Sequence, residues 1–302
     1  IRRPPRSTQS RSSAASDVYK RQPLIDQHDK NGMWGGKFGG NFVPETLKKP
    51  IDDLTTLFSK LRKDKSFIRE RDYHFKNYVG APTPFIKLNN LTDHLGGAQI
   101  WAKVVSENPG TAHKVYASLV HCLIAKRAGK KYVITDTGAG MQGFNLAMAA
   151  KKFGLKCKIF MGLRDFQRQQ SNVRKMKKYG AEVVTVTSGS QTLVDAVSEC
   201  MRYWVANCQS AHMVVGSTVG PNIFVKICGW AASQISRELK VQLKKEFGRV
   251  PNKMKLINCV GGGSSAYGFW SEFIEYNKKP VSYTHLRAHE TLRYLVCRLL
   301  LE

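Results

Sequence analysis

The sequence predicts an α/β protein built on open parallel sheets with helices on both faces. From about residue 99 onward, short apolar runs alternate with longer segments of helical periodicity. A glycine follows most of the helical segments, as is typical where a helix ends and the chain turns toward the next strand. This alternation indicates β–α–β units, in which crossover helices join parallel strands.

The expected elements follow in order. Strands are predicted at residues 99–105, 132–135, 157–161, 182–186, 213–215 and 256–260. Helices are predicted at residues 46–61, 114–128, 141–153, 167–179, 192–206, 222–247 (as one helix or two) and 264–276. Glycines 129, 154 and 180 close three of these helices. Residues 23–98 are punctuated by Gly and Pro, and we expect them to wrap the sheet or to form its entrance.

Composition excludes several classes of protein. The chain has 302 residues, of which 42% are hydrophobic, so wholesale disorder and collagen are excluded. No apolar run approaches the ~20 residues of a membrane span, and we expect no membrane association. The 7 cysteines lack CxxC pairing and predict reduced thiols in an intracellular compartment. We expect a cytoplasmic protein, with a plastid as the alternative.

The chain is strongly basic, with 48 Lys+Arg against 22 Asp+Glu and a formal charge of +26. Many lysines occur in pairs on expected helix surfaces, which favours a solvated basic face over a docking surface for an acidic partner. We find no motif for nucleic-acid binding, and we expect the protein to bind no nucleic acid. Residues 1–22 and 281–302 resemble translated adapter sequence, and both are set aside.

A strand, a glycine-rich turn and a helix are predicted around Gly261, Gly262, Gly263, Ser264 and Ser265. Three successive glycines let main-chain N–H groups face one point, and the two hydroxyls can donate hydrogen bonds as well. This arrangement predicts a phosphate cradle. The alternative is a flexible loop in which a serine caps the helix.

Two further segments lie between a predicted strand and a predicted helix. Lys114 starts a helix, where its charge opposes the helix dipole, so we consider it as a Schiff-base amine. The alternative for Lys114 is a solvated lysine. Taken alone, His113 has the alternative of a packing or surface histidine. Asp136 ends a strand before a glycine-rich turn, where open α/β sheets bind ligands, and could carry a proton. The alternative is that Asp136 caps the helix that follows it.

Together these features resemble the tryptophan synthase β-chain family, which consists of pyridoxal-phosphate enzymes of the second fold type. The resemblance covers essentially residues 32–280. The matching segments are 37–47, 78–84, 110–114, 125–131, 137–140, 180–184, 216–221 and 260–264. The resemblance implies pyridoxal 5'-phosphate, a monovalent cation and no other metal. It also implies L-serine and indole as substrates, a β–β homodimer, and an α chain that is separate or fused upstream.

The resemblance also assigns roles to individual residues. Lys114 is implied as the cofactor-holding and catalytic lysine, and Asp136 as the acid/base. The implied phosphate-side residues are His113, Ser217, Gly261, Gly262, Gly263, Ser264 and Ser265. The implied substrate-carboxylate loop is Thr137, Gly138, Ala139, Gly140, Met141 and Gln142. The reaction implied is β-replacement, in which indole displaces the hydroxyl of serine to give tryptophan.

The same resemblance divides the chain into sub-domains. It implies a cofactor-binding core at residues 23–128 and 217–280, and a mobile sub-domain at residues 129–216. The family's C-terminal portion, which supplies the residue facing the pyridine nitrogen, is not matched. We therefore expect the second sub-domain to be incomplete and the chain to be an incomplete catalyst.

Several residues depart from the family pattern near the expected ligand. Asp136 replaces Glu, Ser265 replaces Asn, and Met141–Gln142 replaces Gln-His. Two alternatives to the tryptophan synthase reaction therefore remain. One is another fold-type II activity, such as a dehydratase or a synthase that uses a different nucleophile. The other is a catalytically lapsed β-like scaffold for an α chain.

Overall fold

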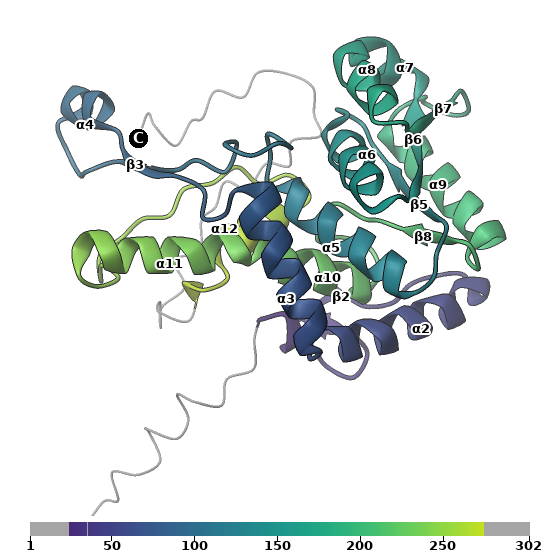
Figure 1. The fold of residues 1–302 in the computed structure, drawn as a ribbon, viewed down its shortest axis with the longest axis horizontal. Coiled ribbons are helices and arrows are strands. Elements are labelled where there is room, and N and C mark those ends of the chain that lie inside the picture. The colour runs from purple at the N-terminus through teal and green to yellow at the C-terminus, as the bar shows by residue number, and fades with distance from the viewer. Residues whose placement is uncertain (1–23, 35, 275–302) are drawn as a thin grey trace, which may run out of the picture.

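The computed structural model describes residues 24–34 and 36–274 (Figure 1). Its largest sheet is parallel and four-stranded, in the order β7–β6–β5–β8. The strands are β5 (Tyr132–Asp136), β6 (Lys156–Gly162), β7 (Glu182–Val186) and β8 (Ala211–Met213). The α/β class predicted from the sequence is confirmed.

Strand β5 lies inside this sheet and pairs in parallel with both β6 and β8. Val133, Ile134 and Thr135 are fully buried, because helices cover both faces of the sheet. The hydroxyl of Thr135 donates a hydrogen bond to the Val214 oxygen at 2.8 Å, so this buried polar group is satisfied. A strand buried on both faces has an apolar sequence, which explains why β5 was predictable.

Helices cover the two faces of the parallel sheet unequally (Figure 1). The helices are α5 (Lys114–Arg127), α6 (Met141–Phe153), α7 (Leu163–Arg168), α8 (Gln170–Lys178) and α9 (Leu193–Asn207). Because β5, β6 and β7 are successive neighbours, right-handed crossovers place α6 and α8 on one face. Helix α9 leads back from β7 to β8 and covers the opposite face.

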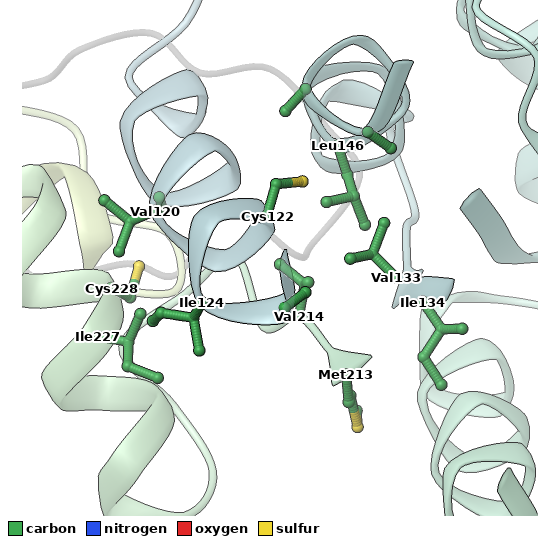
Figure 2. Packing of buried hydrophobic residues seen from close by; sticks show 14 of the residues in the cluster. Val120, Cys122, Ile124, Val133, Ile134, Leu146, Met213, Val214, Ile227 and Cys228 are labelled. Atoms are coloured by element: carbon green, nitrogen blue, oxygen red, sulfur yellow. The ribbon is translucent and has the colours of Figure 1, made fainter. Parts of the chain in front are cut away.

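Helix α5 is surrounded by other elements. Every residue from 115 to 125 is buried. Val120 and Ile124 face Ile227 and Cys228 of α10 (Asn222–Ala232), and Cys122 faces Leu146 of α6 (Figure 2). Because α5 is packed on all sides, its first residue, Lys114, is held by a rigid element.

The chain before α5 forms small elements around this core. They are η1 (Leu24–Asp26), β1 (Met33–Trp34), β2 (Phe38–Gly39), α2 (Glu45–Leu61), α3 (Lys65–His74), the π-helical turn η2 (Phe75–Val79), β3 (Phe85–Lys87), α4 (Asn89–Leu95) and β4 (Trp101–Lys103). Helix α2 buries Leu47, Ile51, Leu54, Phe58 and Leu61, the spacing of one helical face. The amphipathic helix predicted at residues 46–61 is thus confirmed.

A buried ion pair connects the antiparallel pair of strands β3 and β4 to α11 (Gln234–Phe247). Lys103 Nζ lies 2.7 Å from Glu238 Oε2, and both side chains are almost fully buried. Glu238 also accepts a hydrogen bond from the Thr83 N–H at 3.0 Å, and Lys103 donates to the Thr83 oxygen at 2.7 Å. These additional hydrogen bonds satisfy charges that would otherwise be costly to bury.

Three predicted elements differ in extent or pairing. The helix expected at residues 167–179 is divided into α7 and α8, because Gln169 leaves the helical conformation (φ −110°, ψ 34°). The strand expected at 213–215 lies two residues earlier, as β8. The strand expected at 99–105 is shortened to β4, and it pairs antiparallel with β3 outside the parallel sheet.

The prediction of a strand at residues 256–260 is wrong. This segment makes no ladder, because no strand among the described residues lies beside it, and Ile257 is 60% exposed. The helix that follows is α12 (Ser264–Trp270), and the predicted residues 275 and 276 lie outside the described part. Residues 222–247 form two helices, α10 and α11, that meet at Ser233. No helix in the described ranges has the length and apolar character needed to cross a membrane.

Candidate active site

Four segments far apart in the sequence meet next to the start of α5. They are the loop before α5, the loop between β5 and α6, the loop between β8 and α10, and the glycine turn before α12. Parallel strands end at one edge of a sheet, so the loops after β5 and β8 lie on the same side. The predicted site residues occupy these four segments.

Lys114 reaches from the start of α5 to the loop after β8. Its Nζ donates a hydrogen bond to the Gly216 oxygen at 2.7 Å. Burial lowers the pKa of Lys114, while the nearby Cys228 and Asp136 act in the opposite direction. The solvated-lysine alternative is therefore wrong, and Lys114 is a half-buried lysine whose neutral form is favoured.

The Gly216 oxygen is shared by a second donor. Ser264 Oγ donates to it at 3.2 Å, and His113 Nε2 lies 2.9 Å from the same Ser264 Oγ. Burial, and secondarily the charge of Lys114, lowers the pKa of His113 to about 3, so this ring is neutral at pH 7. Because Ser264 has one hydrogen to donate, the network is satisfied when Nε2 of His113 carries its proton.

The glycine turn before α12 packs its backbone directly against residues 217 and 218. A β-carbon on Gly262 would lie 2.6 Å from Ser217 Cβ, and one on Gly263 would collide with the Thr218 hydroxyl. The N–H and the hydroxyl of Thr218 both donate to the Gly262 oxygen, at 2.9 and 3.0 Å. Gly263 also has a φ of 86°, which glycine adopts without strain.

The two serines after this turn have different partners. Ser264 joins the network of Lys114 and His113, whereas the Ser265 hydroxyl lies 3.0 Å from Asn258 Nδ2. The residue that caps α12 is Gly263, and it makes no side-chain hydrogen bond. The alternative in which a serine caps this helix is therefore wrong.

Asp136 is the last residue of β5. Burial raises the pKa of its carboxyl group to about 6, and the positive charge of Lys114 partly opposes this shift. The residue that caps α6 is Gly140, four positions later, so the helix-cap alternative for Asp136 is wrong. A carboxyl group with a pKa near neutrality can both hold and release a proton.

The loop from Thr137 to Gly140 is held by its neighbours. Thr137 Oγ1 accepts from the Gly143 N–H at 3.3 Å, and Asn172 Nδ2 donates to the Ala139 oxygen at 2.7 Å. Gly138 lies against Leu193 of α9, which leaves limited room for a β-carbon. This part of the expected carboxylate loop therefore has a defined shape.

Met141 and Gln142 begin α6 and have different surroundings. The Met141 side chain packs against the apolar core. The Gln142 side chain lies directly on Gly216, so that any β-carbon there would collide with its amide. Both polar atoms of that amide are buried and lack a hydrogen-bond partner among the described residues. An unsatisfied buried amide next to the acceptor of Lys114 fits a polar ligand group.

Sequence reasoning missed three participants. The Gly216 oxygen is the common acceptor of Lys114 and Ser264, but a main-chain carbonyl has no sequence signal. Cys228 lies near Lys114 and Ser264, yet in the sequence it is one small residue in an apolar helix. Asn145 of α6 donates to the Gly110 oxygen in the loop before Lys114. A polar residue within an otherwise apolar helix face was a signal for Asn145.

A cavity of about 550 Å³ lies beside this cluster. Its walls are mainly apolar and include the aromatic residues Trp34, Phe38, Phe42 and Tyr267, together with Thr218 of the loop after β8. Neither Lys114 nor Asp136 lines it, so the cavity is adjacent to the polar cluster and distinct from it.

Residues 77–291, more than half of the chain, match the profile of the family described as "Pyridoxal-phosphate dependent enzyme". The chain belongs to this family. Two relatives support a narrower similarity. The tryptophan synthase beta chain of Bacillus pumilus (strain SAFR-032) is 43% identical over 240 residues, covering 80% of this chain and 60% of that protein. The one of Bacillus subtilis (strain 168) is 43% identical over 239 residues, covering 79% and 59%.

The chain thus spans about 60% of the length of the curated relatives that it matches. Solved structures of two other proteins share its fold. Holo diaminopropionate ammonia lyase from Escherichia coli has a TM-score of 0.54 at 20% identity, covering 67% of this chain and 54% of that one. A pyridoxal 5'-phosphate-dependent aspartate racemase has a TM-score of 0.52 at 18% identity, covering 69% and 59%. At these identities the likeness concerns the fold alone.

The residues present fit pyridoxal phosphate. The cofactor needs an amine for its aldehyde, and Lys114 is a half-buried lysine with a lowered pKa. Its phosphate needs close main-chain N–H groups, and the turn at Gly262 and Gly263 has no space for a side chain. The hydroxyl of Ser264 and the ring of His113 complete a polar set beside that turn.

Proposed function

We propose that the protein catalyses the pyridoxal-phosphate-dependent replacement of the L-serine hydroxyl by indole, giving L-tryptophan. It would thus be a lyase of tryptophan, and therefore aromatic amino-acid, biosynthesis. The observation that carries this proposal is the half-buried Lys114 amine, which lies 2.7 Å from the Gly216 oxygen beside a glycine turn without space for side chains. The 43% identity to tryptophan synthase beta chains favours this reaction over others on the same fold.

Residues around the turn before α12 would hold the cofactor. Lys114 would bind its aldehyde, and the main-chain N–H groups of Gly261, Gly262 and Gly263 would bind its phosphate. Ser217 would donate a hydrogen bond to the same phosphate, and Ser264 and neutral His113 would do so by giving up their present bonds to the Gly216 oxygen and to Ser264. The Ser265 hydroxyl already pairs with Asn258, so this residue would contribute its main-chain N–H.

Proton transfer would be shared by two half-buried groups, Lys114 and Asp136. When bound, pyridoxal phosphate supplies an electron sink that acidifies the α-carbon proton of an amino acid. Lys114 Nζ would take that proton, since burial favours its neutral form. Asp136 would hold a proton on its carboxyl group and deliver it to the departing serine hydroxyl, which leaves as water. Its pKa of about 6 suits that role.

The loop from Thr137 to Gly140 and the first residues of α6 would bind the substrate. The main-chain N–H groups of a glycine-rich turn suit a carboxylate. Gln142 would supply a side-chain donor, because its buried amide has no partner among the described residues. Met141 would contribute apolar contact only, since its side chain packs against the core.

The test is a serine-dependent assay with the full-length natural protein. Indole should be consumed and tryptophan formed only when serine and pyridoxal phosphate are both present. Parallel reactions with thiol nucleophiles, and with serine alone, test the second candidate, another fold-type II lyase or synthase. Asp136, Met141 and Gln142, which depart from the family pattern, favour keeping that candidate. Turnover of a thiol without turnover of indole would replace the first proposal by the second.

A catalytically lapsed scaffold for an α chain is the third candidate. Borohydride reduction followed by peptide mass spectrometry separates it from an enzyme. Cofactor fixed to Lys114 supports an enzyme, whereas absence of any adduct supports the scaffold.

The assembly is also a proposal. We expect a β–β homodimer that binds an α chain, and a monovalent cation as in the family. We further propose that residues 129–216 move as one sub-domain over the core formed by residues 23–128 and 217–280. All four strands of the parallel sheet fall within residues 129–216, which supports a unit that moves together. Light scattering with and without an α chain tests the assembly.

A further inference from the structure

Asn145 lies one turn into α6 and is fully buried. Its Nδ2 donates two hydrogen bonds, to the Gly110 oxygen at 3.1 Å and to the Met141 oxygen at 2.8 Å. Gly110 belongs to the loop that leads into Lys114, and Met141 belongs to the segment, residues 137–142, that is expected to bind the substrate carboxylate. One side-chain amide therefore connects the two loops on which the proposed chemistry depends.

The contact between Asn145 and Gly110 is closely fitted. A β-carbon on Gly110 would lie 3.0 Å from Asn145 Cγ and would collide with Oδ1. The same β-carbon would lie 3.0 Å from Val115 Cβ, immediately after Lys114. The Asn145 amide thus packs directly against the Cα of Gly110. A larger residue at position 110 would displace α6 from the start of α5.

The loop before Lys114 needs support from outside. Thr111 has a φ of 49°, a left-handed conformation that persists only where the surroundings impose it. Asn108 organises the loop internally, accepting from the Gly110 N–H at 2.8 Å and donating to the Ala112 oxygen at 3.3 Å. These bonds determine the shape of the loop, whereas the bond from Asn145 determines its position against α6.

We propose that Asn145 is a positioning residue, which holds the loop before Lys114 against the start of α6. It touches none of the groups assigned to proton transfer, and it acts by holding Lys114 and the carboxylate loop in the relative position seen here, in which residues 129–216 lie against the core. The catalytic meaning rests on the proposed function, but the mechanical role does not. A displaced Gly110 would carry His113 and Lys114 away from Ser264 and Gly216, their partners at 2.9 and 2.7 Å.

Three variants of the full-length protein test this role. N145A removes the amide, and N145L keeps most of its volume but donates no hydrogen bond. N172A is the matched control, because Asn172 donates to the same carboxylate loop, at the Ala139 oxygen, without touching Gly110. If only packing mattered, N145L would behave like wild type. Thermal unfolding and circular dichroism establish that each variant is folded.

The first measurement is hydrogen exchange of the cofactor-free protein. Loss of one buried hydrogen bond should accelerate exchange of residues 105–113 by about three- to ten-fold in both N145A and N145L. N172A should accelerate exchange of residues 137–141 only. Unchanged exchange of residues 105–113 in N145A and N145L would overturn the proposal, whatever reaction the enzyme catalyses.

The second measurement uses the cofactor-loaded enzyme. The pH at which the absorbance of Lys114-bound cofactor titrates should shift in N145A and N145L, and kcat should fall more than KM rises. N172A should change KM for serine without the spectral shift. If wild type takes up no cofactor, the proposed function fails, and the exchange measurement still decides the role of Asn145.

Discussion

The side-chain nitrogen of Lys114 lies 2.7 Å from the main-chain oxygen of Gly216, a residue 102 positions later in the chain. This bond joins the start of α5 to the loop after β8. It also holds Lys114 in a half-buried place, where loss of solvation lowers the pKa of the amine. The cluster around Gly216 supports several predictions that can be tested by substitution.

Replacing Lys114 by Arg should abolish attachment of the cofactor. An arginine keeps the positive charge but offers no amine to the aldehyde, and we expect kcat to fall by at least about a thousand-fold. Borohydride reduction and peptide mass spectrometry measure the attachment directly. The exposed Lys151 of α6 is the matched control, and K151R should leave adduct and rate unchanged. An adduct on another lysine in K114R would contradict the assignment.

Replacing Asp136 by Asn should raise stability and lower activity. The folded-state pKa of Asp136, about 6, exceeds its unfolded value, so between about pH 4 and 6 the folded state binds more protons and is favoured as pH falls. Above pH 6 the buried charge costs stability. D136N removes this cost, which at pH 7 amounts to at most about 3 kcal/mol.

Urea unfolding of D136N and wild type at pH 4 and pH 7 measures this difference. D136N should be more stable than wild type at pH 7 and equally stable at pH 4. The kcat of D136N should fall, because an amide cannot deliver a proton to the leaving hydroxyl. Equal stability of the two proteins at pH 7 would show that the carboxyl group is solvated.

Replacing Gly263 by Ala should weaken cofactor binding. The new β-carbon would collide with the Thr218 hydroxyl and move the phosphate turn. We expect the Kd for pyridoxal phosphate to rise by about ten-fold or more, comparable to the loss of one charged hydrogen bond.

Gly248 is the matched control for that substitution. It has a similar φ of 71°, but a β-carbon there meets nothing within 4 Å. G248A should therefore lower stability by about 1 kcal/mol through backbone strain, without changing cofactor affinity. Fluorescence titration of both variants with pyridoxal phosphate compares them, and equal affinities would argue against the turn as a phosphate site.

A buried histidine pair should make the protein sensitive to acid. His121 Nδ1 and His212 Nε2 lie 2.9 Å apart, and neither ring is exposed. Burial lowers the pKa of His212 to about 3 and that of His121 well below 6.5. The unfolded chain therefore binds more protons below pH 6.5, and stability falls as pH falls through that range.

The expected loss is roughly 2–3 kcal/mol per histidine by about pH 4.5. In H121Q the pair keeps a hydrogen bond but loses one titrating group, so the acid-induced loss should shrink by the share of one histidine, about 2–3 kcal/mol. Urea midpoints of wild type and H121Q between pH 4.5 and 7 measure this. Identical pH profiles would exclude His121 as a source of acid sensitivity.

Local sequence patterns were sufficient to predict much of the fold. Helix α6 spans the predicted residues, Met141–Phe153, and β7 spans the predicted Glu182–Val186. Both have clear stops in the sequence: Gly154 ends the helix, and Gly180 precedes the strand. Residues 256–260 have an equally strand-like pattern, but pairing requires a neighbour that no local pattern specifies, and this prediction was wrong.

The sequence by itself determined the α/β class and the chemistry available, because apolar periodicity, glycines at turns and residue types are local properties. Lys114, Asp136 and the glycine turn were candidates for that reason, and the family resemblance assigned their proposed roles. Only the tertiary structure decided that Gly216 accepts from Lys114 and Ser264, that Asn145 holds Gly110, and that burial raises the pKa of Asp136 to about 6. Such contacts join residues far apart along the chain, and the pKa of a buried group depends on everything that excludes water from it.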